Sequence, residues 1–166
     1  KMCESYNEQH KTNFKCLMPT NTFGPNDNYD SLNSHFLPAL IKKIDKLKNT
    51  KKNTLLLWGN GKAKREVIYV DDIANACVYF MNKKKTPTVI NIGTGKDYSI
   101  EYFAKLISKI ILPQKKIIIK YDLSKPNGNK RKVMDVSLAK KLGWTYVTDI
   151  KKAISLTYHS YQKEKK

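Results

Sequence analysis

One imidazole and two guanidinium groups are the side chains of this chain best suited to chemistry on an anionic compound. His35 follows a long polar stretch, and an imidazole that titrates near neutral pH can both take up and release a proton. Arg65 and Arg131 are the only arginines among 32 basic residues. The planar guanidinium group binds phosphate or carboxylate through two parallel hydrogen bonds. The simpler alternatives are a surface histidine at a helix start and ordinary surface ion pairs.

A polar, turn-rich segment leads to this histidine. The apolar residues 14–18 form a short predicted strand that stops at Pro19, and polar residues then continue to His35. Long polar loops inside compact α/β domains are uncommon and are often functional. The segment is therefore predicted to be one wall of a ligand site.

Segments with a strand pattern alternate with segments of helical periodicity, which predicts an α/β fold. Helices are predicted at 1–11, 33–47, 71–81, 99–110, 136–142 and 148–161, and strands at 14–18, 54–58, 66–70, 89–92 and 116–121. The predicted N-terminal caps of four helices are Asn33 or Ser34, Asp71 or Asp72, Ser99, and Thr148 or Asp149. Residues 123–132 form a basic loop.

The net charge of +18 is compatible with a nucleic-acid partner or with a compositional bias toward lysine. The lysines are scattered rather than gathered in one motif, so we favour the bias and expect no specific nucleic-acid binding. No apolar run approaches the length of a membrane span, and no membrane partner is expected. Three cysteines without ligand spacing fit reduced thiols in a cytoplasmic protein.

Two short patterns have structural interpretations. The pair Asp71-Asp72 lies at a predicted helix start, where acidic side chains stabilise the positive end of the helix dipole, so no metal site is predicted. Gly93-Thr-Gly95 is predicted to be a turn. The Gly-x-Gly-x-x-Gly pattern of a dinucleotide-binding turn is completed neither there nor elsewhere in the sequence.

Several motifs spread over essentially the whole chain resemble those of the GDP-L-fucose synthase family, a group of extended short-chain dehydrogenase/reductases. The matching segments are Lys1-Met-Cys-Glu-Ser-Tyr-Asn7, Met18-Pro-Thr-Asn21, Gly24-Pro-Asn-Asp-Asn28, Asn33-Ser-His35, Pro38-Ala-Leu40, Trp58-Gly59, Arg65-Glu66, Tyr69-Val-Asp-Asp72, Asn91-Ile-Gly-Thr-Gly95, Ser124-Lys-Pro126, Arg131-Lys132, Asp135-Val136 and Leu142-Gly-Trp144. Two of them, Tyr-Val-Asp-Asp and Asn-Ile-Gly-Thr-Gly, are shared widely among nucleotide-sugar epimerases and dehydratases.

The resemblance implies that the chain is a single C-terminal fragment of a Rossmann-type enzyme. Residues 1–35 would be the end of the Rossmann part with the active-site loop, and residues 36–166 would be mostly the substrate-binding subdomain. The Gly-rich turn and the catalytic Ser, Tyr and Lys of the family are expected before residue 1. The fragment alone is therefore expected to be inactive.

The activity implied by the resemblance is NADPH-dependent epimerisation and reduction of a GDP-keto-deoxysugar, without a metal and in a homodimer. His35 would exchange protons with the sugar, together with a cysteine that precedes residue 1. The NADP(H) cofactor would contact Pro19, Thr20, Asn21, Thr22 and His35. Thr22 departs from the aliphatic residue that is usual in the family.

The resemblance also implies a set of substrate-binding residues. They are Lys43, Trp58, Arg65, Lys125, Asn127 and Arg131. Lys43 stands where the family often has arginine, and Asn127 stands where it often has aspartate. For Trp58, packing in the core remains an alternative. The alternative functions are another nucleotide-sugar epimerase or dehydratase and, more distantly, a basic nucleic-acid-binding module.

Overall fold

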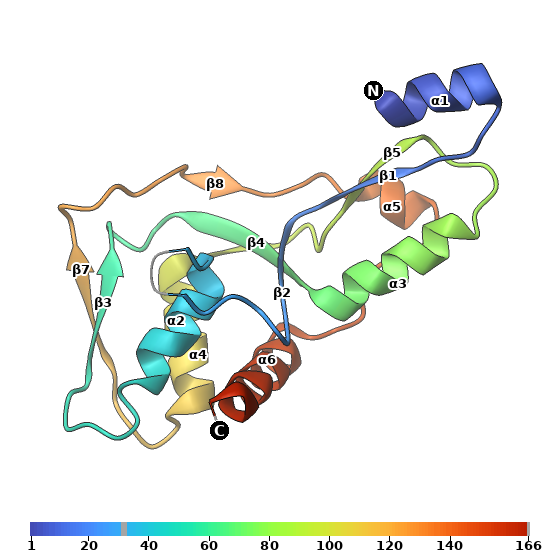
Figure 1. Ribbon diagram of the computed structural model, residues 1–166. Helices are drawn as coiled ribbons and strands as arrows, with labels where there is room; N and C mark the ends of the chain where they lie inside the picture. The colour runs from blue at the N-terminus through green and yellow to red at the C-terminus, as the bar shows by residue number, and fades with distance from the viewer. Residues whose placement is uncertain (31–32, 166) are drawn as a thin grey trace.

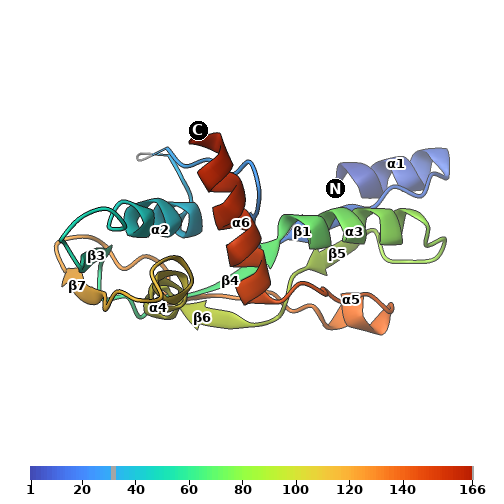
Figure 2. The same ribbon diagram turned by 90° about the horizontal axis from the view of Figure 1, so that it is seen from below.

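Strand β4, Lys64–Tyr69, lies between the two ends of an elongated molecule (Figures 1 and 2). The computed structural model describes residues 1–30 and 33–165. Strand β4 pairs in parallel with β2 (Asn21–Phe23) and β8 (Arg131–Lys132), and antiparallel with β6 (Asp97–Ser99). This strand therefore brings three distant parts of the chain together at the middle of the molecule.

At one end, β1 (Cys16–Pro19) pairs in parallel with β5 (Val89–Ile92). Around this pair lie α1 (Met2–His10), α3 (Val70–Met81) and α5 (Ser137–Lys141), as Figure 1 shows. At the other end, β3 (Thr54–Trp58) pairs in parallel with β7 (Ile118–Asp122), near α2 (Phe36–Asp45) and α4 (Ile100–Ile111). Helix α6 (Ile150–Glu164) packs against α4 and β4, nearer the middle of the molecule.

Each end has its own hydrophobic core, and β4 contributes to both. Val67 and Tyr69 pack with the core of α2, α4 and α6, whereas Ile68 packs with Phe80 and Trp144 at the other end. Successive side chains of a strand point to opposite faces, which explains this division. The two cores are thus joined through one strand.

The C-terminal helix is fixed to α2 by a polar cluster on Asp45. The hydroxyl of Tyr158 donates to one carboxylate oxygen of Asp45 at 2.8 Å, and the ammonium group of Lys165 donates to the other at 2.5 Å. These contacts join α6 directly to α2, and both helices also pack on α4.

The α/β fold predicted from the sequence is confirmed, and most elements lie within a few residues of their predicted bounds. Three short strands were missed. Strand β2 lies inside the predicted polar loop, β6 follows the Gly93–Gly95 turn, and β8 ends the predicted basic loop. Their hydrogen-bond partners are on the distant strand β4, so no local pattern marks them.

Two predicted helix caps are confirmed and two are wrong. The hydroxyl of Ser99 accepts the Tyr102 N–H at 3.0 Å, and the Asp149 carboxylate accepts the N–H groups at the start of α6. Helix α2 instead begins after His35, with no side-chain cap, so neither Asn33 nor Ser34 caps it. Helix α3 has Tyr69 at its N-cap position, and Asp71 and Asp72 lie in its first turn. In the part of the chain described here, no helix is long and apolar enough to cross a membrane.

Candidate functional site

An open groove of about 600 Å³ separates the start of β2 from β8 and the residues that follow it. Its lining residues are Pro19, Thr20, Asn21, Arg131, Lys132, Val133 and Met134. Pro19, Thr20 and Asn21 were expected to contact the cofactor, and Arg131 was expected to contact the substrate. All four residues line this groove. Thr22, also expected to contact the cofactor, is half-buried, and its hydroxyl donates to the Thr20 carbonyl at 3.1 Å.

The first wall of the groove consists of residues 19–21 and is held in place by hydrogen bonds to neighbouring strands. The Asn21 side-chain amide donates to the Glu66 carbonyl oxygen at 2.8 Å, and the Thr20 backbone N–H donates to the Ile92 carbonyl at 3.0 Å. Because Asn21 is exposed, its side-chain oxygen can accept a further hydrogen bond from a compound in the groove.

The second wall consists of residues 131–134, and its Arg131 forms an ion pair with Asp97. Arg131 donates from Nε and Nη2 to the two carboxylate oxygens of Asp97, at 2.5 and 3.2 Å. Hydrogen bonding to Arg131 is the main cause that holds the pKa of Asp97 below its usual value. Asp97 thus occupies two donors of the guanidinium group, and the exposed remainder of Arg131 stays at the groove.

A fully buried carboxylate, that of Glu66, lies between the two walls. One of its oxygens accepts the backbone N–H groups of Thr94 and Gly95, at 2.5 and 2.7 Å, and the other accepts that of Met134, at 2.7 Å. A Cβ atom on Gly93 would lie 2.3 Å from the first oxygen, so only glycine allows this close approach.

Two ammonium groups lie near the ring of Trp58, at the end of β3. The Nζ atoms of Lys43 and Lys125 are 5.4 and 5.7 Å from the ring centroid, within the range of a cation–π contact. Loss of hydration lowers the pKa of Lys43 below its usual value. The indole is 63% exposed, so the alternative that Trp58 packs in the core is wrong.

Arg65 and Asn127 hold the basic loop against the turn after β3. Arg65 donates from Nη1 to the carbonyls of Lys64 and Asn129, both at 2.7 Å. The side-chain oxygen of Asn127 accepts the backbone N–H of Asn60 at 2.7 Å. The hollow beside these contacts has a volume of about 510 Å³ and is lined by Asn60, Lys62, Ala63, Asn127, Gly128 and Lys130.

His35 is exposed, with extended backbone geometry, immediately before α2. None of the hydrogen bonds between described residues joins its side chain to the groove or to Trp58. Its charge acts on Asp27, in the same loop. Burial raises the pKa of the Asp27 carboxyl, while the Asn28 N–H and His35 oppose that rise.

The model of the NAD dependent epimerase/dehydratase family matches residues 1–93. The chain belongs to this family. A putative GDP-L-fucose synthase of Arabidopsis thaliana is 37% identical over 161 residues, which are 97% of this chain and 48% of that protein. A GDP-L-colitose synthase of Yersinia pseudotuberculosis is 38% identical over 99% of this chain and 54% of that protein. The expected resemblance to the GDP-L-fucose synthases is therefore confirmed.

A solved structure agrees with the fold of this family member. The NADP-bound GDP-L-fucose synthetase of Naegleria fowleri superposes with a TM-score of 0.84 at 25% identity, over 98% of this chain and 50% of that chain. The chain spans about half the length of the curated relatives it matches.

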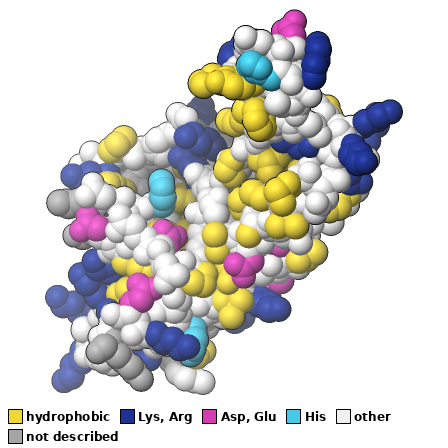
Figure 3. Space-filling view, turned by 45° about the vertical axis from the view of Figure 1, so that its right-hand side comes forward, with side chains coloured by type: hydrophobic (Ala, Val, Ile, Leu, Met, Phe, Trp, Pro, Cys, Tyr) yellow, Lys and Arg dark blue, Asp and Glu magenta, His cyan; other side chains and the backbone are white. Residues whose placement is uncertain are grey.

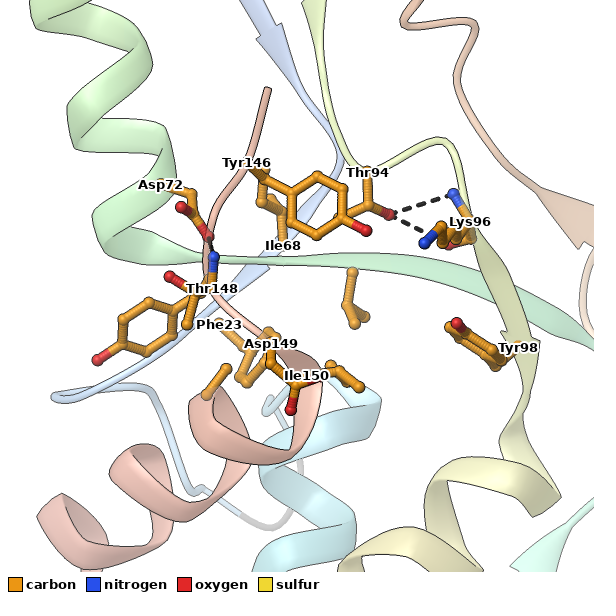
Figure 4. Close-up of a pocket in the computed structure, with 13 residues that line it drawn as sticks. Phe23, Ile68, Asp72, Thr94, Lys96, Tyr98, Tyr146, Thr148, Asp149 and Ile150 are labelled. Atoms are coloured by element: carbon orange, nitrogen blue, oxygen red, sulfur yellow. Dashed lines mark hydrogen bonds between the residues drawn. The ribbon is translucent and has the colours of Figure 1, made fainter. Parts of the chain in front are cut away.

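Another pocket of this family member, in Figure 4, lies between β4 and the segment that leads to α6. Its volume is about 110 Å³, and none of the site residues expected from the sequence lines it. The buried Asp72 carboxylate accepts the N–H groups of Val147 and Thr148 there, at 3.0 and 3.3 Å. Small-molecule sites are usually several times larger, so this pocket is too small for a nucleotide sugar.

Hydrophobic side chains gather on a different face, over α1, β1 and α3 (Figure 3). The exposed apolar residues of these elements and the segment between α1 and β1 include Met2, Tyr6, Phe14, Met18, Val78 and Met81. These six residues are not among the predicted site residues, although Pro19, which lines the groove, ends the same strand β1.

Two residues that shape the groove were not predicted from the sequence, Glu66 and Asp97. A charged side chain inside the apolar run of β4 was a usable signal for Glu66, because a buried carboxylate needs partners. Nothing in the local sequence around Asp97 pairs it with Arg131.

Proposed function

We propose that this chain supplies the sugar-nucleotide site of a GDP-L-fucose synthase. That activity is the NADPH-dependent 3,5-epimerisation and 4-reduction of GDP-4-keto-6-deoxy-D-mannose to GDP-L-fucose. The observation that carries the proposal is the exposed Trp58 ring with Lys43 and Lys125 beside it. A flat aromatic face flanked by cations suits a nucleobase joined to a diphosphate.

The diphosphate would lie between Trp58 and Arg65. Arg65 is half-buried and is already oriented by two backbone carbonyls, and its other guanidinium nitrogens can donate to phosphate oxygens. Lys43 and Lys125 add charge without fixing direction. Asn127 would hold the turn of Asn60 in place rather than supply a charge.

The sugar would extend into the groove between Asn21 and Arg131. His35 would exchange a proton with the carbons on either side of the ketone, a task that suits an imidazole side chain. NADPH, when bound, supplies the hydride for C4. The exposed Asn21 amide and the backbone of Pro19 and Thr20 fit the nicotinamide end, because they offer uncharged hydrogen-bonding groups. A homodimer and a cytoplasmic location belong to the same proposal.

Fluorescence titration tests the nucleotide part of this proposal. Trp58 is exposed, whereas the other tryptophan, Trp144, is 3% exposed, so a bound base should quench Trp58 selectively. We expect saturable quenching by GDP and GDP-mannose, weaker quenching by UDP and UDP-glucose, and no response in Trp58→Phe. Equal or stronger binding of the uridine compounds would instead favour another nucleotide-sugar epimerase or dehydratase.

The same preparation tests the nucleic-acid alternative. A basic binding module would bind duplex DNA tightly, with an affinity that falls steeply as salt rises. We expect weak binding at physiological salt, with no preference for sequence. Tight duplex binding together with absent GDP binding would contradict the proposal.

A further inference from the structure

We infer that Glu66 is a positioning residue that sets the width of the groove between Asn21 and Arg131. This inference rests on the proposed function, in which that groove holds the sugar. Glu66 does not line the groove, so its effect would pass through the backbone groups that it holds.

Glu66 contacts both walls. Its backbone carbonyl accepts the Asn21 side chain on the first wall, and its carboxylate accepts the Met134 N–H on the second. The same carboxylate accepts the N–H groups of Thr94 and Gly95, in the turn that follows β5. Strand β5 in turn holds the first wall through the Thr20 N–H.

The chemistry of these contacts requires a carboxylate. Three backbone N–H donors and the Thr94 hydroxyl point at two acceptor oxygens. A carboxylate accepts at both oxygens, whereas a glutamine of the same shape presents an NH₂ group to one set of donors. Glu66→Gln would therefore release either the Met134 side or the Gly95 side, and the two walls would no longer be held together.

The nucleotide end should be insulated from this change. Arg65 and Glu66 are neighbours on β4, and successive side chains of a strand point to opposite faces. Arg65 is held by the carbonyls of Lys64 and Asn129, neither of which contacts the Glu66 carboxylate. A purely structural role for Glu66 would instead weaken every ligand contact together.

The test compares GDP with GDP-mannose by Trp58 fluorescence in the wild-type chain, Glu66→Gln and Glu66→Asp. We expect the wild-type chain to bind GDP-mannose more tightly than GDP; this difference in affinity is the gain from the sugar. Glu66→Gln should keep the affinity for GDP within about twofold of wild type but should bind GDP-mannose no more tightly than GDP. Glu66→Asp keeps the charge but is one methylene shorter, so it should retain part of that gain. Thermal unfolding of each variant shows whether it folds. If Glu66→Gln does not fold, the affinities of Glu66→Asp for GDP and GDP-mannose are compared with those of the wild-type chain instead.

Different outcomes separate the two ideas. If wild type does not bind GDP, the proposed function and this inference both fall. If wild type binds GDP but gains nothing from the sugar, or if folded Glu66→Gln keeps the full gain, the inference alone is overturned. Equal loss of GDP and GDP-mannose affinity in both variants would also overturn it.

Discussion

Lys43 lies with its ammonium nitrogen 5.4 Å from the centre of the Trp58 ring. This contact joins α2, which begins directly after His35, to the end of β3. Lys125 approaches the same ring from the basic loop, at 5.7 Å. Helix α2, strand β3 and the more distant basic loop therefore meet at one indole, where the proposed site holds its nucleotide.

Replacing Lys43 should weaken nucleotide binding without unfolding the chain. We expect Lys43→Gln to raise the Kd for GDP about fivefold, because a charge contact near the surface contributes about 1 kcal/mol. Lys46→Gln makes the same change in charge on an exposed residue just after the same helix and is the matched control. An equal effect of both substitutions would mean that only net charge matters.

The two neighbouring aspartates of α3 should differ in their effect on stability. Asp72 is 3% exposed and accepts two backbone N–H groups from the segment before α6. Asp72→Asn leaves one of these donors without an acceptor, so the free energy of unfolding should fall by about 1 to 3 kcal/mol. Asp71 is exposed, and Asp71→Asn should change it by less than about 0.5 kcal/mol. Urea denaturation measures both, and similar values for the two variants would contradict the assigned role of Asp72.

The Asp97–Arg131 pair should respond to acid. The pKa of Asp97 is lowered, chiefly by its hydrogen bond from Arg131, so the pair stabilises the fold above the ordinary aspartate pKa. That contribution is lost as pH falls through the lowered value. Carboxyl NMR titration should show the Asp97 pKa rising toward its ordinary value in Arg131→Gln. The pKa of Asp122, lowered mainly by the Ser124 hydroxyl, should stay unchanged, and an unshifted Asp97 in the wild type would refute the pair.

The chain by itself should not oxidise NADPH when given the GDP-keto sugar. Its sequence contains no Gly-x-Gly-x-x-Gly turn for a dinucleotide pyrophosphate. Absorbance at the NADPH band, followed with and without sugar nucleotide, should therefore show no turnover above the rate without protein. Sugar-dependent oxidation that scales with the concentration of the chain would contradict this expectation.

Local signals in the sequence were enough to predict the helices that have a capping residue, an apolar stripe or a terminating glycine of their own. Helix α4 has a capping serine, Ser99, and an apolar stripe that includes Phe103 and Ile107, and it was predicted to within one residue at each end. Gly143 was predicted to end the short helix α5. It lies just after that helix with φ at +91°, a backbone conformation that favours glycine. In these places the deciding contacts lie within one or two turns of chain.

Strand β3 shows a limit of such patterns. Its residues alternate between exposed and buried, yet Leu55 and Leu57 on the buried face are matched by Leu56 and Trp58 on the exposed face. Since both faces are apolar, the sequence did not reveal which one faces solvent. The exposure of Trp58 became clear only from the packing of β3 in the structure.

The groove could not be assembled from the sequence, because its contacts span long separations. Glu66 binds Met134 across 68 positions, and Asn21 binds Glu66 across 45. The resemblance to a known family supplied the residue names on both walls, whereas the buried carboxylate between them was found only in the structure. The role of His35 at the groove is part of the proposed function and does not follow from a contact between them in the described part of the chain.

The Asp45 cluster has a practical consequence for all of these measurements. Lys165, next to the end of the chain, is bound to Asp45, two residues from Lys43 on the same helix. An affinity tag fused after Lys165 would crowd this contact, and we expect it to disturb the proposed nucleotide site indirectly. Helix α1 buries none of its residues, so a tag at the N-terminus is the safer choice for purification and titration.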